Sequence, residues 1–170
     1  MKRLIQFITI ATLAYGMAGC AAKKELMITY GSNHNIESQI ISVGKDGTKM
    51  IKAWAFAKNP ELAFMYAKRN AVSAAIFKGF PAGGGSGMVG AIVRNPNADT
   101  EHKAFFDEFF KDDGKWAQYV VSKNVGMPSG NDRLKVGKGY KVGASVAVKF
   151  DALRKYLEDS NIAKKLDEGF

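Results

Sequence analysis

The most regular pattern in the chain is an alternation of apolar and polar positions near its C-terminal end. The apolar set is Tyr140, Val142, Ala144, Val146, Val148 and Phe150, and it alternates with Lys141, Gly143, Ser145, Ala147 and Lys149. A period of two places the first set on one face of a strand and the second set on the other. The pattern therefore predicts a strand over 140–150 in an antiparallel sheet, with one face buried and one wet.

A β-hairpin is predicted in the first half of the chain. Two runs rich in apolar residues, 36–43 and 50–58, flank Asp46-Gly47, a dipeptide typical of hairpin turns. In the second run one face carries Ile51, Ala53, Ala55 and Ala57, and the other carries Met50, Lys52, Trp54 and Phe56. Shorter strands are predicted over 88–93, over 116–123 and from Leu134, with a break or turn at 137–139.

A buried helix is predicted directly after this hairpin. Asn59 is suited to the N-cap, Pro60 to the first turn, and Glu61 to the positive end of the helix dipole. Gly79 and Pro81 end the helix after residue 77 or 78. Small residues recur along one side at helical spacing, which allows close approach to a sheet; they are Ala63, Ala67, Ala71 and Ala74.

Two further helices complete the predicted fold. One covers 100–113 and carries a stripe of Phe105, Phe106, Phe109 and Phe110, which we interpret as core. The other is capped by Asp151, carries Leu153, Tyr156 and Leu157, and continues its apolar face at Ile162 and Leu166. Strands with a few helices on one sheet face predict an α+β domain with a largely antiparallel sheet and a central Ala-rich helix. With 170 residues, 46% of them hydrophobic, residues 26–170 suit a single domain.

The first twenty residues follow a different pattern. Lys2 and Arg3 precede an apolar stretch over 4–18, and small residues lead to Cys20. This arrangement is typical of a secretory signal, and the stretch is too short and interrupted for a transmembrane helix of about 20 apolar residues. We predict a signal peptide over 1–19 with cleavage between Gly19 and Cys20. The alternative is an ordinary signal peptide that contains a Cys, but the only Cys of the chain falls at the cut.

The tetrapeptide Met17-Ala18-Gly19-Cys20 resembles the lipobox of bacterial lipoproteins. It matches that motif at its last three residues and departs at Met17, where Leu is usual. The resemblance implies a diacylglycerol on the Cys20 sulfur and stable anchoring to a membrane. Residues 20–25 then form a lipidated tether that holds the domain close to the membrane. Ala21 stands where the family's retention signal has Asp, so the resemblance favours the outer membrane. Lys23 and Lys24 do not resemble an acidic surface-export run, which favours the periplasmic face of that membrane.

Charge narrows the range of partners. The chain has 25 basic and 16 acidic residues, a net charge of +9, and removal of Lys2 and Arg3 lowers it to +7. A basic protein can bind nucleic acid, but an exported one meets little of it. Anionic headgroups or acidic wall polymers are closer counterparts, and the dispersed lysines are explained most simply by solubility.

The residues that could carry chemistry do not form a catalytic pattern. His34 and His102 lack the neighbouring ligands that a zinc site needs, and an acylated Cys20 leaves no thiol. The run Gly83, Gly84, Gly85, Ser86 and Gly87 lacks the Gly-Lys-Ser/Thr ending of a phosphate loop and the Gly-x-Ser-x-Gly of a hydrolase elbow. We interpret it as a flexible connection; the alternative is a loop that orders on a partner.

A second group of candidates is acidic. Asp107, Glu108, Asp112 and Asp113 fit the outer face of a helix better than an acid–base pair. The sequence therefore predicts no catalytic residue, no metal and no cofactor.

The C-terminal half resembles a known envelope domain. Residues 138–162, with the alanine series of the central helix, are similar to the small membrane-associated lipoproteins related to the N-terminal part of flagellar assembly protein T. The resemblance implies an α+β envelope module without known catalytic residues. The glycine run and the phenylalanine stripe have no counterpart in it.

Three hypotheses follow. The first is a non-enzymatic, membrane-tethered envelope module that binds an envelope protein or supports an assembly. The second is a binder of a lipid or other small amphiphile, with Trp54, Phe56 and Trp116 in an apolar pocket. The third is an enzyme that uses the Ser86 loop or a carboxylate pair.

Replacement of Cys20 tests the anchor directly. We expect Cys20→Ser to abolish incorporation of an alkyne-tagged fatty acid and to move the protein from the membrane to the soluble fraction, because the sulfur that carries the lipid is gone. Met17→Leu, which restores the usual lipobox residue, should speed processing. A Cys20→Ser protein that stays in the membrane fraction would contradict lipid anchoring through this residue.

Overall fold

The computed structural model describes residues 30–31, 34–123 and 126–165. The predicted signal peptide, Cys20, the tether and Leu166 lie outside them. The elements in chain order are β1 (Ser38–Val43), β2 (Thr48–Ala57), α1 (Pro60–Phe77), α2 (Ala98–Glu101), α3 (Lys103–Phe110), the 3-10 helix η1 (Lys115–Tyr119), β3 (Val120–Ser122), the 3-10 helix η2 (Gly130–Asp132), β4 (Arg133–Val136), β5 (Gly139–Lys149) and α4 (Phe150–Asp159).

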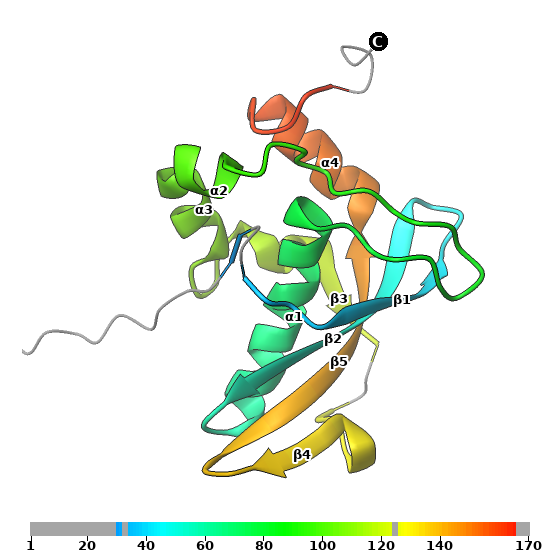
Figure 1. Cartoon of the computed structure of the whole chain (residues 1–170), viewed down its shortest axis with the longest axis vertical. Helices are drawn as coiled ribbons and strands as arrows, with labels where there is room; N and C mark the ends of the chain where they lie inside the picture. The colour runs from blue at the N-terminus through cyan, green and yellow to red at the C-terminus, as the bar shows by residue number, and fades with distance from the viewer. Residues whose placement is uncertain (1–29, 32–33, 124–125, 166–170) are drawn as a thin grey trace, which may run out of the picture.

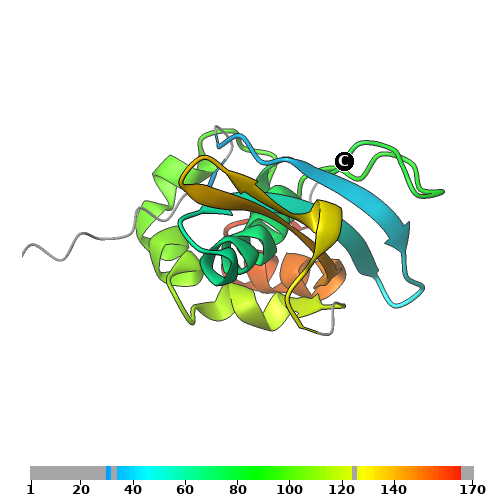
Figure 2. The ribbon, with the colours of Figure 1, turned by 90° about the horizontal axis from the view of Figure 1, so that it is seen from below.

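The strands form one curled antiparallel sheet in the order β1-β2-β5-β3 (Figure 1). β3 pairs with the C-terminal part of β5, and β4 pairs with the N-terminal part of β5. β2 and β5 are the two central strands. Their pairing runs from Thr48 opposite Lys149 to Ala57 opposite Tyr140. Seen along the sheet, α1 lies near the centre of the molecule, with α3 and α4 on the same side of the sheet (Figure 2). The predicted α+β class is confirmed.

The central helix is formed as its sequence predicts. The Asn59 side chain accepts a hydrogen bond from the Leu62 N–H at 2.8 Å, and Pro60 opens the helix. The helix ends at Phe77, and Gly79 adopts a left-handed φ of 71°. The four alanines at helical spacing, Ala63, Ala67, Ala71 and Ala74, are all 0% exposed. Their lack of bulk lets the helix lie close against β2 and β5, where it buries the inner face of the sheet.

The C-terminal end of α1 explains why no strand forms over 88–93, where we predicted one. A helix leaves its last carbonyls without partners. Here the Ile92 N–H donates to the Ala75 carbonyl at 3.1 Å, and the Val93 N–H donates to the Ile76 carbonyl at 2.9 Å. The apolar side chains of Ile92 and Val93 are buried, but their backbone caps a helix instead of joining the sheet.

The predicted helix over 100–113 is two shorter helices. α2 and α3 meet at His102, whose φ of −111° and ψ of 34° lie outside helical values. The phenylalanine stripe is core as predicted, with Phe106 and Phe110 0% exposed. The sequence gives no hint of Arg69, a buried cation on α1 that donates to the Phe110 carbonyl at 3.0 Å. This bond joins α1 to the C-terminal end of α3, where the helix dipole favours a cation.

Two element boundaries differ from the sequence prediction. Residues 115–119 form a 3-10 helix instead of the first half of a strand, because Trp116 turns inward and its Nε1 donates to the Lys111 carbonyl at 2.9 Å. α4 begins at Phe150, so Asp151 lies in the first turn and makes no capping hydrogen bond.

The glycine run is packed against the domain at its first two residues. Gly83 and Ser86 exchange backbone hydrogen bonds of 3.0 and 2.9 Å and form a tight turn. This turn lies on β1 at Ile41, the extra residue of a β-bulge. A Cβ at Gly84 would stand 1.8 Å from the Ile41 carbonyl oxygen, whereas a Cβ at Gly85 would meet nothing within 4 Å. Glycine at position 84 is therefore required by close packing as well as by its φ of 56°.

These two glycines form a matched pair for a stability test. Gly84→Ala and Gly85→Ala share the cost of a left-handed alanine, about 1–2 kcal/mol. Only Gly84→Ala forces the turn away from β1, which should cost about 1–3 kcal/mol more. Urea unfolding of both variants measures the difference, and equal losses would show that the turn does not pack on β1.

Candidate functional site

The outer face of the sheet is the surface that no described α-helix covers. It carries the β2 residues Met50, Lys52, Trp54 and Phe56 beside the β5 residues Lys141, Gly143, Ser145 and Ala147. Trp54 lies against Gly143, where a Cβ would stand 2.7 Å from the indole Nε1. Lys52 lies over the Trp54 ring and forms an ion pair of 2.6 Å with Asp132. Around Trp54 and Lys52 this face is therefore covered by its own side chains.

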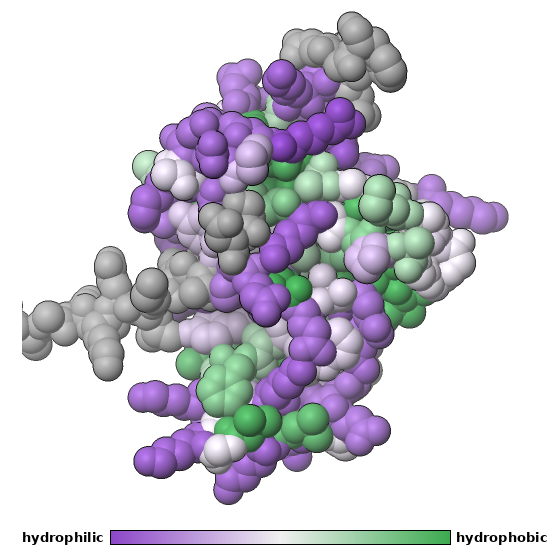
Figure 3. All heavy atoms as spheres, in the orientation of Figure 1, coloured by the Kyte–Doolittle hydropathy of each residue, from purple (hydrophilic) through white to green (hydrophobic). Residues whose placement is uncertain are grey.

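The end of this face near the β4–β5 hairpin is apolar and exposed. Phe56, Leu134 and Val136 have exposed fractions of 57%, 47% and 47%. Leu134 and Val136 pair with Lys141 and Gly139, which places them on the same face as Phe56. In Figure 3 hydrophobic atoms gather at this end of the molecule among hydrophilic ones. Large apolar side chains grouped in this way mark a surface for binding.

This apolar end meets an open edge of the sheet. β1 begins at Ser38, opposite Ala53, while β2 continues to Ala57. The Trp54 N–H donates to the Glu37 carbonyl at 3.0 Å, and the Trp54 carbonyl accepts from Asn70 Nδ2 at 2.9 Å. Beyond this point the described chain supplies β2 with no partner on its β1 side.

A groove of about 360 Å³ runs along this edge. Four parts of the fold line it: the segment before β1 with His34, Asn35 and Glu37, β2 with Trp54, Ala55 and Phe56, α1 with Tyr66 and Asn70, and the β4–β5 hairpin with Val136 and Lys141. Since Ala55 faces α1 while Phe56 faces outward, the groove straddles the edge of the sheet.

Two oppositely charged side chains that line the groove form an ion pair with each other. Lys141 Nζ lies 2.5 Å from Glu37 Oε2, so this pair bridges the strand and the segment before β1. Burial lowers the pKa of His34, and the positive charge of Lys78 lowers it further. Nothing in the described chain gathers three or more His, Cys, Asp or Glu side chains as a metal site would.

The structure separates most of the residues that the sequence singled out. Trp54 and Phe56 both line the groove, but Trp116 is buried beside α3 and does not. Ser86 Oγ donates to the Gly87 carbonyl. Glu108 pairs with Lys111, and Asp112 pairs with Arg69. His34 reaches the groove, whereas His102 lies at the junction of α2 and α3.

Sequence reasoning missed the groove residues Tyr66, Asn70, Val136 and Lys141, which come from distant parts of the chain. The one available signal was Phe56, a large aromatic on the predicted wet face of β2.

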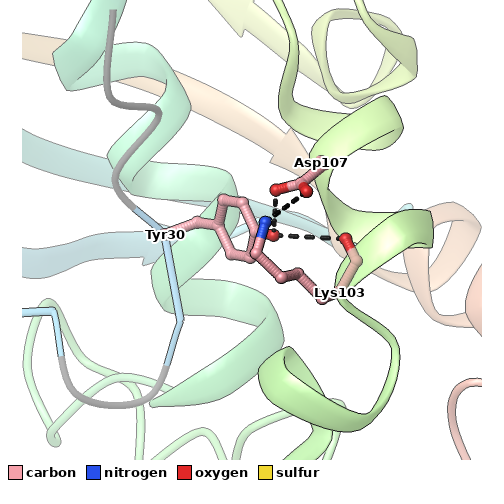
Figure 4. Close-up of polar contacts among 3 residues, drawn as sticks. All are labelled: Tyr30, Lys103 and Asp107. Carbon is pink, nitrogen blue, oxygen red and sulfur yellow. Dashed lines mark hydrogen bonds and ion pairs between the residues drawn. The ribbon is translucent and has the colours of Figure 1, made fainter. Parts of the chain in front are cut away.

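At its N-terminal end the described domain is fixed by Tyr30. The ring stacks on Phe110 with 5.0 Å between centroids and also contacts Phe77 and Phe106. Its hydroxyl donates to Asp107 at 2.7 Å, and Lys103 pairs with the same carboxylate (Figure 4). The Lys103 contact, followed by the Tyr30 hydrogen bond, lowers the pKa of Asp107. The first described residue is therefore held against α3.

No family model, curated protein or solved structure matches this chain. The resemblance to lipoproteins related to flagellar assembly protein T stays a prediction. None of the helices in the described part of the chain has the length and apolar character needed to cross a bilayer.

The Tyr30 hydroxyl gives a pH-dependent contribution to stability. Burial, followed by the hydrogen bond to Asp107, raises its pKa well above the ordinary 10.0. A raised folded-state pKa stabilises the fold fully below the unfolded value and loses this effect as pH rises above it. At pH 7 we expect Tyr30→Phe to lower the free energy of unfolding by about 0.5–1 kcal/mol, a net hydrogen bond to a partly exposed group.

The difference between wild type and Tyr30→Phe should then shrink as the pH rises from about 10 to about 12. Urea unfolding of both proteins across this range measures it, and other ionising groups cancel in the comparison. A difference that stays constant would show that Tyr30 ionises equally in the folded and unfolded states.

Proposed function

We propose that the protein is a lipid-anchored, non-enzymatic module of the cell envelope that binds a protein partner in the groove beside β2. One observation carries the proposal: the groove combines an open sheet edge with exposed apolar side chains at Phe56 and Val136. Specific interfaces are built around such apolar and aromatic anchors with a polar rim. Acylated Cys20 supplies the anchor in this proposal.

The length of the tether supports a role close to the membrane. Ten residue steps separate Cys20 from Tyr30, the first described residue. An extended chain spans about 3.3–3.6 Å per residue, so α3 stays within about 35 Å of the lipid. A binding module held this close meets partners in or near the same membrane. The periplasmic face of the outer membrane is the location we propose.

The state of the polar side chains supports a binding role over catalysis. An acid–base pair needs two groups that share a site and differ in pKa. Of the acidic residues considered above, Asp107, Glu108 and Asp112 each have a basic partner. Ser86 Oγ is bonded to a backbone carbonyl, an arrangement that does not activate a nucleophile.

A small amphiphile is the second candidate ligand. The groove volume of about 360 Å³ falls in the range of small-molecule sites. Trp54 and Phe56 line it, whereas Trp116, the third residue of the pocket hypothesis, does not. Native mass spectrometry of the protein as purified from cells distinguishes the two. A co-purified lipid that Phe56→Ala releases would favour the amphiphile.

Site-specific photocrosslinking in living cells tests the partner. Val136 lines the groove and Val121 lies on β3, at the opposite end of the sheet; both are strand valines with 47% of their surface exposed. We expect a photoreactive residue at 136 to give a defined crosslinked envelope protein and the same residue at 121 to give none. Equal products at both positions, or no product at 136, would contradict a partner site in the groove.

A further inference from the structure

We infer that the groove binds an extended acidic and aliphatic peptide segment, which joins the sheet as an added strand beside Phe56. The inference rests on the proposed function and specifies how the partner binds and what chemistry it brings. Addition of a strand to an exposed sheet edge is a common way for proteins to recognise peptides.

The pairing of β2 fixes where the backbone groups of Phe56 point. In an antiparallel sheet the N–H and C=O of one residue face the same neighbouring strand, and successive residues face opposite neighbours. The Trp54 N–H bonds to Glu37 on the β1 side. The N–H and C=O of Phe56, two residues later, therefore face the same side, where the described chain has turned away from β2. Phe56 presents one donor and one acceptor to the groove.

Asn70 marks the point where an added strand begins. In a regular ladder the Trp54 carbonyl would accept from the N–H of Glu37. Here Asn70 Nδ2 takes that place at 2.9 Å, so the last carbonyl beside β1 is satisfied by a side chain from α1. The first open pair is that of Phe56. An added segment gains two main-chain hydrogen bonds there, and side-chain contacts must supply the rest of the affinity.

The two sides of the groove differ in chemistry, which sets the pattern of the peptide. Successive side chains of a strand point to opposite faces. On the α1 side they meet Ala55 and Tyr66, which suit aliphatic residues. On the outer side they meet Phe56 and Lys141.

The β4–β5 hairpin at this end of the groove carries a net positive charge on its two faces together. Leu134 and Val136 share the outer face with Phe56, so Arg133 and Lys135 point to the opposite face of β4. Residues 130–141 carry four basic side chains, Arg133, Lys135, Lys138 and Lys141, and one acidic side chain, Asp132. Asp132 pairs with Lys52, and Lys141 pairs with Glu37, so each of these pairs is neutral. Arg133, Lys135 and Lys138 remain as the positive surplus of the hairpin. Acidic residues in the peptide therefore complement the net positive charge of this end of the domain.

A twelve-residue peptide of alternating valine and glutamate is the probe. The full-length protein, as the cell processes it, is held in nanodiscs of zwitterionic lipid, and residue-resolved hydrogen exchange follows the amide of Phe56. We expect this amide to exchange freely in the free protein and to become protected with peptide, with affinity that weakens as salt rises. Lysine in place of glutamate in the peptide should abolish the protection.

A matched pair of variants isolates the backbone contact. Phe56→Pro removes the edge N–H without removing a bond to β5, and Phe56→Ala removes the ring and keeps the N–H. We expect Phe56→Pro to bind at least about fivefold more weakly than Phe56→Ala, the size of one net hydrogen bond. If Phe56→Pro does not fold, N-methylation of alternate peptide bonds in the probe makes the same test from the other side.

Four results would overturn strand addition. The first is protection of the Phe56 amide in the free protein, which would mean that another part of this chain or a second copy covers the edge. The second and third are equal binding of the probe by the two folded variants, and equal binding of the N-methylated and unmethylated probes by the unmodified protein. The fourth is protection by anionic nanodiscs without peptide, which would make the surface a membrane contact. A partner that still crosslinks at position 136 in the Phe56→Pro protein as strongly as in Phe56→Ala would leave the proposed function standing and remove only strand addition. If the protein without a Phe56 substitution gives no crosslinked partner at position 136, the proposed function itself is removed.

Discussion

The close contact between the alanine side of α1 and the inner face of β2 and β5 is the constraint on which the rest of the structure depends. Ala63, Ala67, Ala71 and Ala74 are fully buried, and valines of β5 such as Val142 and Val146 are buried opposite them. Small side chains on the helix and β-branched ones on the sheet bring the two layers close enough to exclude water. A larger residue at any of these alanines would separate the layers. The other helices then pack around a pair that is already formed.

The use of one sheet face for the core leaves the other face available. All the described α-helices lie on the α1 side of the sheet (Figures 1 and 2). They therefore leave uncovered the outward side chains of Trp54 and Phe56 and the β4–β5 hairpin. Part of this face is closed by Trp54 and Lys52, and the part near Phe56 is not. The offset between a short β1 and a long β2 adds an open edge at the same place. Groove, apolar surface and basic hairpin thus meet because of how the sheet is staggered.

The other end of the domain has a different role. Tyr30 is held by three phenylalanine rings and by Asp107, and this fixes the first described residue against α3. Arg69 reinforces the same region by linking α1 to the end of α3. The attachment at α3 and the groove beside β2 are built from separate elements.

The sequence by itself determined the α+β class, the hairpin of β1 and β2, the strand β5 and both ends of α1, because each rests on local periodicity, capping or turn chemistry. It also determined that Phe106 and Phe110 are core. Only the tertiary structure decided the rest. Residues 88–93 are apolar enough for a strand, but their N–H groups are used by the open carbonyls of α1, and Trp116 is drawn into a 3-10 helix by a bond to Lys111. The groove lay beyond sequence reasoning for the same physical reason: its lining residues, from His34 to Lys141, are brought together by strand pairing and helix packing, which no local pattern encodes.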